Sequence, residues 1–301
     1  MADIEKRAES EIMKYLEILK NNGYMVSQPQ KGNYCVEVTI DGASGKLKLQ
    51  VYYGKKGLKT VLQGNKDSKI YADVNSLIFS ELPFEKEDFI EPEKYIGTDE
   101  SGKGDFFGPL VIAGVVVEKE IKKRLEEIGV RDSKQIAHLS IKNLAGKIKS
   151  ICGQSSFNVV VINPPRYNEL YEKFGNLNRM LAWGHARVLE NILSNKEASA
   201  AISDKFGDER LILDSLQEKG KKLELYQFPK AEKYTAVAAA SILARDRFND
   251  WFDMKKKEIN IVLPKGASDK VTEAARKIKT EYGQDFLSQL IKTHFKTYRS
   301  L

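Results

Sequence analysis

Residues 95–117 read YIGTDESGKGDFFGPLVIAGVVV and combine acidic, basic and strongly apolar groups in a short space. Two adjacent carboxylates, Asp99 and Glu100, precede a glycine-rich turn that carries Lys103. The apolar run at 110–117 that follows is typical of a strand buried on both faces. Carboxylates and a lysine beside such a strand indicate metal-dependent phosphate chemistry.

A nucleotide-binding P-loop, G-x-x-x-x-G-K-[ST], is the rival interpretation of this stretch. Gly97, Gly102 and Lys103 fit the pattern, but its last position is Gly104, which lacks the hydroxyl that would bind magnesium. The two carboxylates inside the loop would also repel a polyphosphate held by backbone N–H groups. We therefore interpret the stretch as a carboxylate site.

Residues 97–110 resemble the first signature of the type 2 ribonucleases H, and of ribonuclease HIII in particular, which reads G-T-D-E-S-G-K-G-D-[FY]-F-G-P-L. Further blocks follow in the order of that family and together span residues 95 to about 295. They are 131–134, 163–168 continuing through 176–178 to 181–186, 204–206, 231–232 with 237–245, and 263–266. A chance match over six ordered blocks is not credible.

The composition is that of an ordinary globular protein, and 301 residues predict two domains. With 49 Lys and Arg against 42 Asp and Glu, the charge of +7 favours a polyanionic partner. Cys35 and Cys152 are the only cysteines, and they predict packed thiols in a reducing compartment. The first ten residues have no apolar signal core and the run at 110–117 is too short to span a bilayer, so we expect a cytoplasmic protein without membrane contact.

The N-terminal part has apolar residues at helical spacing over 3–20, and alternating segments at 36–40, 47–53 and 58–62. This pattern predicts a helix on a small antiparallel sheet. We place the N-terminal domain at 1–82, a linker at 83–93 and a second domain at 94–301. The resemblance implies that the first domain binds substrate and is similar to the TATA-box-binding protein.

A lysine-rich stretch at 46–69 contains seven lysines and a single acidic residue, Asp67. It is either a solvated strand face that protects a sheet edge, or a surface that follows phosphates, with Tyr52 and Tyr53 available for stacking on bases. Both interpretations stay open. The lysines are Lys46, Lys48, Lys55, Lys56, Lys59, Lys66 and Lys69.

The second domain has the mixed-sheet order of the ribonuclease H fold, an α/β core with helices on the sheet faces. Asp99 follows the first strand and Asp204 follows the strand at 198–203, so the two meet if these strands are neighbours. Glu100 can join Asp99 only if the strand has already ended, because successive strand residues point to opposite faces. The expected strands are 95–98, 110–117, 157–162, 198–203 and 223–227, and the expected helices are 166–195, 209–219 and 232–256.

The resemblance implies a catalytic, metal-binding set of Asp99, Glu100, Asp204 and Glu232, with glutamate in the fourth place where ribonuclease HII has aspartate. Such hard oxygen ligands suit two Mg²⁺ or Mn²⁺ ions, which activate a water and stabilise the leaving oxygen. The resemblance implies substrate contacts at Ser101, Gly102, Lys103 and Gly104, and the family's contact with ribose 2′-hydroxyls carries over to the stretch Gly102-Lys103-Gly104. Substrate contacts also carry over to Ser133 and Lys134, which either bind phosphate or belong to a plain loop.

The histidines do not form a metal set. We expect His185 to be packed on the long helix, whereas His294 keeps an open role in catalysis or phosphate binding, since the broader family has a C-terminal histidine near the site. The alanines at 238–240 and Ser241 are expected to be scaffold, small because their helix packs closely on the sheet.

The resemblance to ribonuclease HIII thus implies an endonuclease that hydrolyses the RNA strand of RNA/DNA hybrids, leaving 5′-phosphate and 3′-hydroxyl ends, and we expect it to be a monomer. One alternative is ribonuclease HII-like cleavage at single ribonucleotides in DNA. The other is a hybrid-binding protein of the same fold without catalysis.

Overall fold

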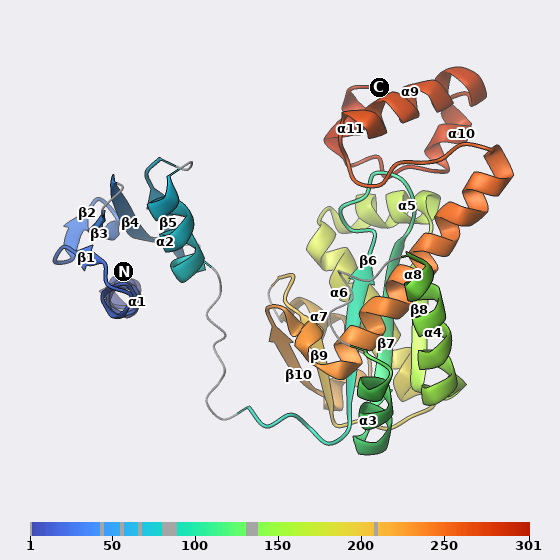
Figure 1. The fold of residues 1–301 in the computed structure, drawn as a ribbon, viewed down its shortest axis with the longest axis horizontal. Coiled ribbons are helices and arrows are strands. Elements are labelled where there is room, and N and C mark those ends of the chain that lie inside the picture. The colour runs from blue at the N-terminus through green and yellow to red at the C-terminus, as the bar shows by residue number, and fades with distance from the viewer. Residues whose placement is uncertain are drawn as a thin grey trace. The chain divides into compact units, whose positions relative to one another are not determined.

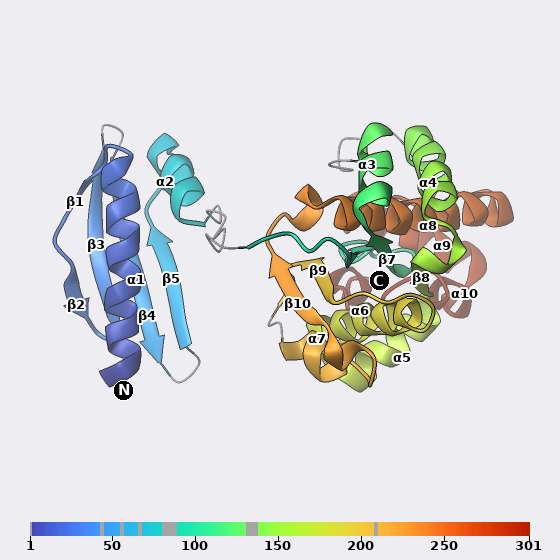
Figure 2. The same cartoon turned by 90° about the horizontal axis from the view of Figure 1, so that it is seen from below.

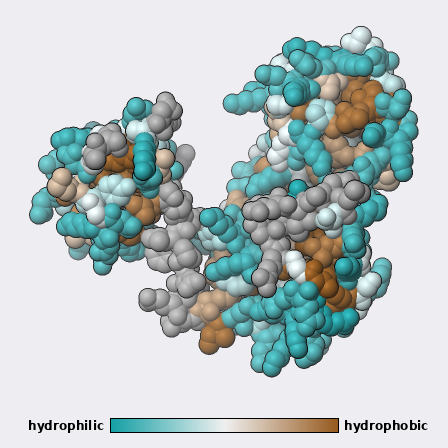
Figure 3. Space-filling model, viewed as in Figure 1, coloured by the Kyte–Doolittle hydropathy of each residue, from teal (hydrophilic) through white to brown (hydrophobic). Residues whose placement is uncertain are grey.

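The structure is a computed structural model that describes residues 2–42, 45–54, 57–65, 68–79, 89–130, 138–207 and 210–301. The chain divides into two compact units, Met1–Phe89 and Ile90–Leu301. Figure 1 labels the helices and strands of each unit. Hydrophilic residues cover most of the described surface of each unit on the face shown in Figure 3. Among the described helices, none is long and apolar enough to cross a membrane.

The N-terminal unit is a helix-covered antiparallel sheet, as predicted. Its strands are β1 (Met25–Val26), β2 (Gln30–Gly32), β3 (Cys35–Gly42), β4 (Gly45–Gly54) and β5 (Gly57–Gln63), in the order β1-β3-β4-β5 with β2 beside β3. Helices α1 (Ala2–Asn21) and α2 (Lys69–Phe79) lie on one face of this sheet (Figure 2). Alternate residues of β3 and β4, such as Val38 and Leu49, are buried with Ile12 and Leu19 of α1. The other face of the sheet has no helix on it among the described residues.

The second unit contains a mixed five-stranded sheet in the order β10-β9-β6-β7-β8. The first three strands along the chain, β6 (Tyr95–Ser101), β7 (Leu110–Val117) and β8 (Phe157–Ile162), are antiparallel neighbours. Strands β9 (Ala200–Asp204) and β10 (Glu224–Phe228) then add in parallel on the other side of β6. Every residue of β7 is buried, which explains its unbroken apolar sequence. The predicted ribonuclease H-like order is confirmed.

Helices cover both faces of this sheet (Figure 2). One layer contains α3 (Lys119–Glu127), α4 (His138–Cys152) and the long α8 (Thr235–Ile259), and the opposite layer contains α5 (Pro164–Phe174), α6 (Leu177–Leu193) and α7 (Arg210–Ser215). The start of α8 lies so close to β6 that a Cβ on Gly97 would come within 2.3 Å of the backbone of Ala236 and Val237. Three further helices follow α8, namely α9 (Asp269–Tyr282) and the short α10 (Gln284–Ser288) and α11 (Lys296–Arg299).

Several element boundaries differ from the sequence-based expectations, and three of these differences affect the site. The helix expected at 209–219 is Arg210–Ser215, and the strands expected at 198–203 and 223–227 are Ala200–Asp204 and Glu224–Phe228. The helix predicted at 166–195 is two helices, because Gly175 ends α5 in a left-handed conformation and the Asn176 side chain caps α6. The helix expected from 232 begins at Thr235, after a 3₁₀ turn at Ala231–Lys233. Strand β6 continues to Ser101, since its pairing with β7 extends beyond Asp99.

Candidate active site

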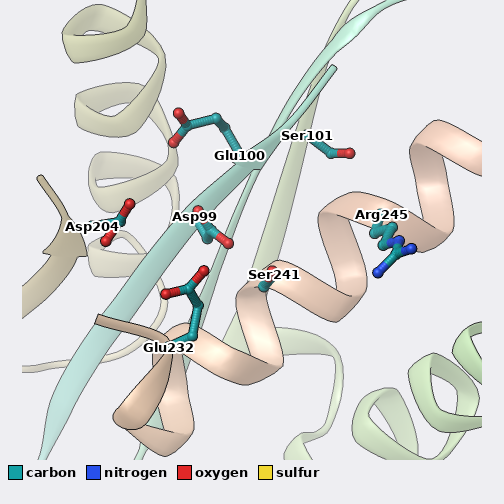
Figure 4. A pocket seen from close by; sticks show the side chains of 7 residues that line it. All are labelled: Asp99, Glu100, Ser101, Asp204, Glu232, Ser241 and Arg245. Carbon is teal, nitrogen blue, oxygen red and sulfur yellow. The ribbon is translucent and has the colours of Figure 1, made fainter. Parts of the chain in front are cut away.

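A pocket of about 360 Å³ opens at the end of the second sheet, where β6 and β9 finish and α8 begins. It brings together carboxylates from three separate parts of the chain (Figure 4). The residues that line it are Asp99, Glu100, Ser101, Asp204, Glu232, Ser241 and Arg245. All four carboxylates expected from the sequence therefore lie in one place.

Parallel pairing of β6 with β9 explains why Asp99 and Asp204 meet. Thr98 is in register with Ser203, so the next residue of each strand reaches the same rim of the sheet. Asp204 then accepts a hydrogen bond from the backbone N–H of Ala231 at 3.1 Å. This bond holds the 3₁₀ turn against β9 and places Glu232 at the pocket.

Asp99 is a buried carboxyl group whose pKa is raised above the usual value for aspartate. Burial raises its pKa to about 8, and the negative charges of Glu100 and Glu232 act in the same direction. The hydroxyl of Ser241 opposes this rise through a hydrogen bond. Figure 4 shows Asp99, Glu232 and Ser241 pointing toward one another below β6. A bound cation would relieve the same repulsion.

Glu100 reaches the pocket from the other side of β6, contrary to the expectation that the strand ends before it. Because β6 continues to Ser101, Glu100 points away from Asp99 and toward α6 (Figure 4). There its Oε2 lies 3.1 Å from Nε2 of His185, and Nδ1 of the same ring lies 2.9 Å from Oγ1 of Thr98. The carboxylate accepts from Nε2, since an ionised carboxylate can only accept.

The surroundings of Glu100 favour its charged form. Burial alone would raise its pKa, but the hydrogen bond and charge of His185, followed by the cation of Lys103, outweigh burial and lower the pKa. Nζ of Lys103 lies 3.4 Å from Oε1 of Glu100 and 5.7 Å from the centroid of the Phe206 ring. The two adjacent carboxyl groups are thus shifted in opposite directions.

His185 is packed, as predicted, and has no exposed surface. Its ring also stacks on Phe206, with centroids 4.9 Å apart. Sequence reasoning missed its two hydrogen bonds, which link Thr98 to Glu100 across the interior. Only the tertiary contact of α6 with β6 reveals them.

Ser241 and Arg245 are the pocket residues that sequence reasoning did not assign to the site. The expectation that Ser241 is scaffold is wrong in this respect, because its side chain lines the pocket and contacts Asp99. Arg245 lies one helical turn later on α8, so both point from the same face. The four-residue spacing of two polar residues after an alanine run is the signal that could have identified them.

The turn after the carboxylates is shaped by Gly102. This residue is buried with φ +90°, and a Cβ there would lie 2.2 Å from the carbonyl oxygen of Pro109 and 2.7 Å from the Phe248 ring. Only glycine fits both the conformation and the space. Lys103 and Gly104 follow, and Gly104 is exposed. Ser133 and Lys134, the other expected substrate contacts, lie outside the described residues.

His294 is not among the residues that line the pocket. It stacks on Tyr171 and Tyr167 of α5, with centroid distances of 4.2 and 5.5 Å. Burial, and then the charge of Lys292, lowers its pKa to about 4. An uncharged ring in an aromatic stack is suited to packing rather than to phosphate binding.

The open sheet face of the N-terminal unit carries a row of polar side chains. Glu37 accepts hydrogen bonds from Lys48 at 2.9 Å and from Gln50 at 2.7 Å, and the hydroxyl of Tyr52 donates to Gln50 at 3.2 Å. Lys59 lies opposite Tyr52 in the β4–β5 ladder. Tyr53 instead faces the helices and packs on the core, so of the two tyrosines only Tyr52 is on this face.

Not all of the predicted basic stretch belongs to that face. Lys46 shares it and pairs with Asp41 at 2.9 Å, whereas Lys69 begins α2. Lys55, Lys56, Lys66 and Asp67 lie outside the described residues.

Comparison with known proteins agrees with these features. The family model described as "Ribonuclease HII" matches residues 96–298. The chain is 44% identical to the ribonuclease HIII of Protochlamydia amoebophila over 208 residues, which cover 69% of this chain and 68% of the relative. It is 35% identical to the ribonuclease HIII of Chlamydia caviae over 286 residues, which cover 94% and 91% of the two chains.

A solved structure extends the likeness to the fold of both units. The crystal structure of Bst-RNase HIII in complex with Mn²⁺ superimposes with a TM-score of 0.63 at 24% identity, covering 95% of this chain and 94% of that one. The expected combination of a ribonuclease H-like core and a small N-terminal α+β domain is confirmed. The chain belongs to the ribonuclease HIII family, whose members are endonucleases that hydrolyse the RNA strand of RNA/DNA hybrids.

Proposed function

We propose that this chain cuts hybrids at the pocket described above, and that Asp99, Glu100, Asp204 and Glu232 hold two divalent ions there. The observation that carries the proposal is the convergence of these carboxylates from β6, β9 and the turn before α8. Their oxygens are the donors that Mg²⁺ and Mn²⁺ prefer. The Mn²⁺ complex of Bst-RNase HIII supports the use of such an ion.

The electrostatics of the pocket support this choice of cofactor. Burial, and after it the negative charges of Glu100 and Glu232, raise the pKa of Asp99 to about 8, so its ionised form is disfavoured until a cation is near. The four carboxylates share the pocket, but within the described residues no three His, Cys, Asp or Glu side chains are already close enough to hold one ion. Divalent ions supply activation of a water and stabilisation of the leaving oxygen when bound.

The remaining pocket residues receive roles from their positions. His185 and Lys103 hold the Glu100 carboxylate in its ionised form, and Ser241 orients Asp99. Arg245 offers a cation to the phosphate next to the scissile bond. Ser101 and the turn at Gly102, Lys103 and Gly104 contact ribose 2′-hydroxyls, and Ser133 with Lys134 binds the backbone phosphate.

The two units divide the work in this proposal. The domain at 1–82 adds affinity through its open sheet face, the linker at 83–93 joins it to the core, and the domain at 94–301 performs the chemistry. We further propose that the protein acts as a cytoplasmic monomer. Buried, unbridged Cys35 and Cys152 suit a reducing compartment.

A direct test compares two substrates. A uniform RNA/DNA hybrid and a DNA duplex containing one ribonucleotide are each incubated with Mg²⁺ or Mn²⁺, and the ends of the products are analysed. We expect rapid cleavage of the hybrid with 5′-phosphate and 3′-hydroxyl ends. Preferential cleavage at the single ribonucleotide would favour a ribonuclease HII-like activity, and binding without cleavage by either metal would contradict the proposal.

A further inference from the structure

Lys292 is a charged side chain with no exposed surface, and it lies outside the carboxylate pocket. Its Nζ donates a hydrogen bond to the backbone oxygen of Asp105 at 2.7 Å and lies 5.4 Å from the centroid of the Tyr167 ring. Burial lowers its pKa to about 7, with the Asp105 carboxylate opposing the shift. An apolar side chain of the same length would pack here at lower cost, so the ammonium calls for a specific explanation.

The bond from Lys292 is one of several that fasten the chain between β6 and β7 to the C-terminal part of the unit. The backbone N–H of Gly266 donates to Oδ1 of Asp105 at 2.7 Å, and its carbonyl accepts from Phe106 at 2.9 Å. The backbone N–H of Lys292 donates to the carbonyl oxygen of Phe106 at 2.9 Å. The backbone N–H of Gly108 donates to the carbonyl oxygen of Leu290, also at 2.9 Å. We call these contacts of residues 105–108 with 266 and 290–292 the C-terminal clamp. Figure 1 shows this connection passing beside α9–α11.

The clamp fixes one end of the turn that follows the carboxylates. At the other end, Gly102 is held beneath Pro109 and against Phe248, where no side chain fits. Between these anchors only Lys103 and the exposed Gly104 remain. The turn is therefore held at both ends, one by the α8 layer and one by the C-terminal segment.

We propose that Lys292 is a positioning residue that sets the turn at Gly102, Lys103 and Gly104 for recognition of the RNA strand. This inference rests on the proposed contact of the turn with ribose 2′-hydroxyls. A loop that is ordered before binding loses little conformational entropy when substrate arrives. Loss of the ammonium therefore weakens binding of the hybrid more than binding of a DNA duplex, which offers no 2′-hydroxyl.

The test removes the ammonium and keeps the length of the side chain. Dissociation constants of Lys292→Met are measured by fluorescence anisotropy, without divalent metal, for an RNA/DNA hybrid and for the DNA duplex of the same sequence. We expect the hybrid constant to rise about tenfold, the scale of one hydrogen bond, and the duplex constant to stay within about twofold. Single-turnover cleavage at saturating enzyme should stay within about threefold of wild type, because the carboxylates are untouched.

Lys279→Met is the matched control. Lys279 also donates to a backbone carbonyl of the C-terminal region, that of Leu301 at 2.8 Å, but has no bond to the turn in the described residues. Its hybrid constant should equal that of wild type. The inference would be overturned if Lys292→Met weakened binding of hybrid and duplex equally, or if it folded and bound the hybrid as wild type does. The same weakening of hybrid binding in Lys279→Met would also overturn it.

A second pair of variants serves if Lys292→Met does not fold. Asp105→Asn keeps an oxygen that can accept from Gly266, whereas Asp105→Ala removes it. The alanine variant alone should lose discrimination between hybrid and duplex, and equal discrimination in both would overturn the inference. A wild type that cleaves the hybrid but binds hybrid and duplex equally would contradict the proposed contact of the turn with ribose 2′-hydroxyls, and a wild type that cleaves neither would contradict the proposed function.

Discussion

The two units of this protein differ in how far their charged side chains are removed from solvent. On the N-terminal sheet, Lys48 and Glu37 pair at 2.9 Å on the face that carries no described helix, where both side chains keep partial contact with solvent and the pair contributes little to stability. In the second unit, Asp99 and Glu100 are largely withdrawn from solvent, and their pKa values are shifted in opposite directions. The contrast is consistent with the proposed separation of affinity, on the N-terminal sheet, from chemistry, at the buried carboxylates.

Removal of one buried carboxylate is the strongest test of that separation. Asp99→Asn and Asp204→Asn preserve shape and remove metal-binding charge, so each should reduce cleavage by about a thousandfold or more. Hybrid binding should change little, because the sheet face of the other unit is intact. Single-turnover rates at saturating metal measure the loss. A variant that keeps more than about a tenth of the wild-type rate would remove that residue from the metal set.

The carboxylate of Glu232 should show an intermediate sensitivity. Glu232 lies in a short turn rather than in a strand, so the charge should matter more than the reach of the side chain. We expect Glu232→Asp to keep at least about ten times more activity than Glu232→Gln, since water can complete the coordination of a hard cation. Metal titrations of cleavage compare the two variants. If Glu232→Gln cleaves as fast as Glu232→Asp, or faster, the role of Glu232 does not depend on its charge.

Removal of lysine charges from the N-terminal sheet should affect binding of the hybrid rather than the rate of cleavage, and the effect should be smaller. In Lys48→Gln/Lys59→Gln, the hybrid dissociation constant should rise, and the slope of log affinity against log salt should flatten by roughly 0.7 to 0.9 for each phosphate that is no longer neutralised. Cleavage at saturating enzyme should persist. A salt titration of binding measures the slope, with Lys20→Gln on α1 as the control.

An unchanged slope in the double variant would mean that these lysines only solvate the strand face. A truncated protein that starts near Glu91 extends the comparison to the whole domain. If it folds but does not cleave even at saturation, the N-terminal unit must help to position the scissile phosphate.

The sequence predicted those features that depend on local pattern. The apolar run at 110–117 identified a buried strand, and the position of Asp99 and Asp204 after strands predicted their meeting. The order of the strands followed from the succession of elements and the resemblance. These inferences hold because strand ends in an α/β sheet converge on one edge.

The remaining features depend on contacts between distant segments. The side of β6 to which the Glu100 side chain points depends on how far β7 continues to pair with β6. No residue next to Glu100 in the sequence predicts the length of that pairing. The hydrogen bonds of His185 and the clamp at Lys292 likewise require α6 and the C-terminal segment to be in place. The break at Gly175 is different, because glycine followed by asparagine is a local signal for one helix ending and another beginning.

The last expected effect concerns stability rather than activity, and it is a pH dependence that belongs to Asp99. Its pKa rises from 3.8 to about 8 on folding, so between these values the folded state binds more protons than the unfolded state. Stability from this group is therefore present at low pH and is lost as the pH rises, by at most about 1.4 kcal/mol per pH unit. His294, with a lowered pKa, acts in the opposite direction between about pH 4 and 6.5.

The informative quantity is therefore a difference between two proteins. Asp99→Asn lacks the titrating group, so its stability relative to wild type should increase steadily from pH 5 to 7.5 in the presence of a chelator. Urea unfolding followed by tryptophan fluorescence reports this unit alone, because Trp183 and Trp251 are the only tryptophans in the chain. Saturating Mg²⁺ should abolish the trend, since a bound cation favours the ionised carboxylate. If the stability difference between Asp99→Asn and wild type does not change with pH, Asp99 is already ionised without metal. Burial and the neighbouring carboxylates would then raise its pKa less than the structure indicates.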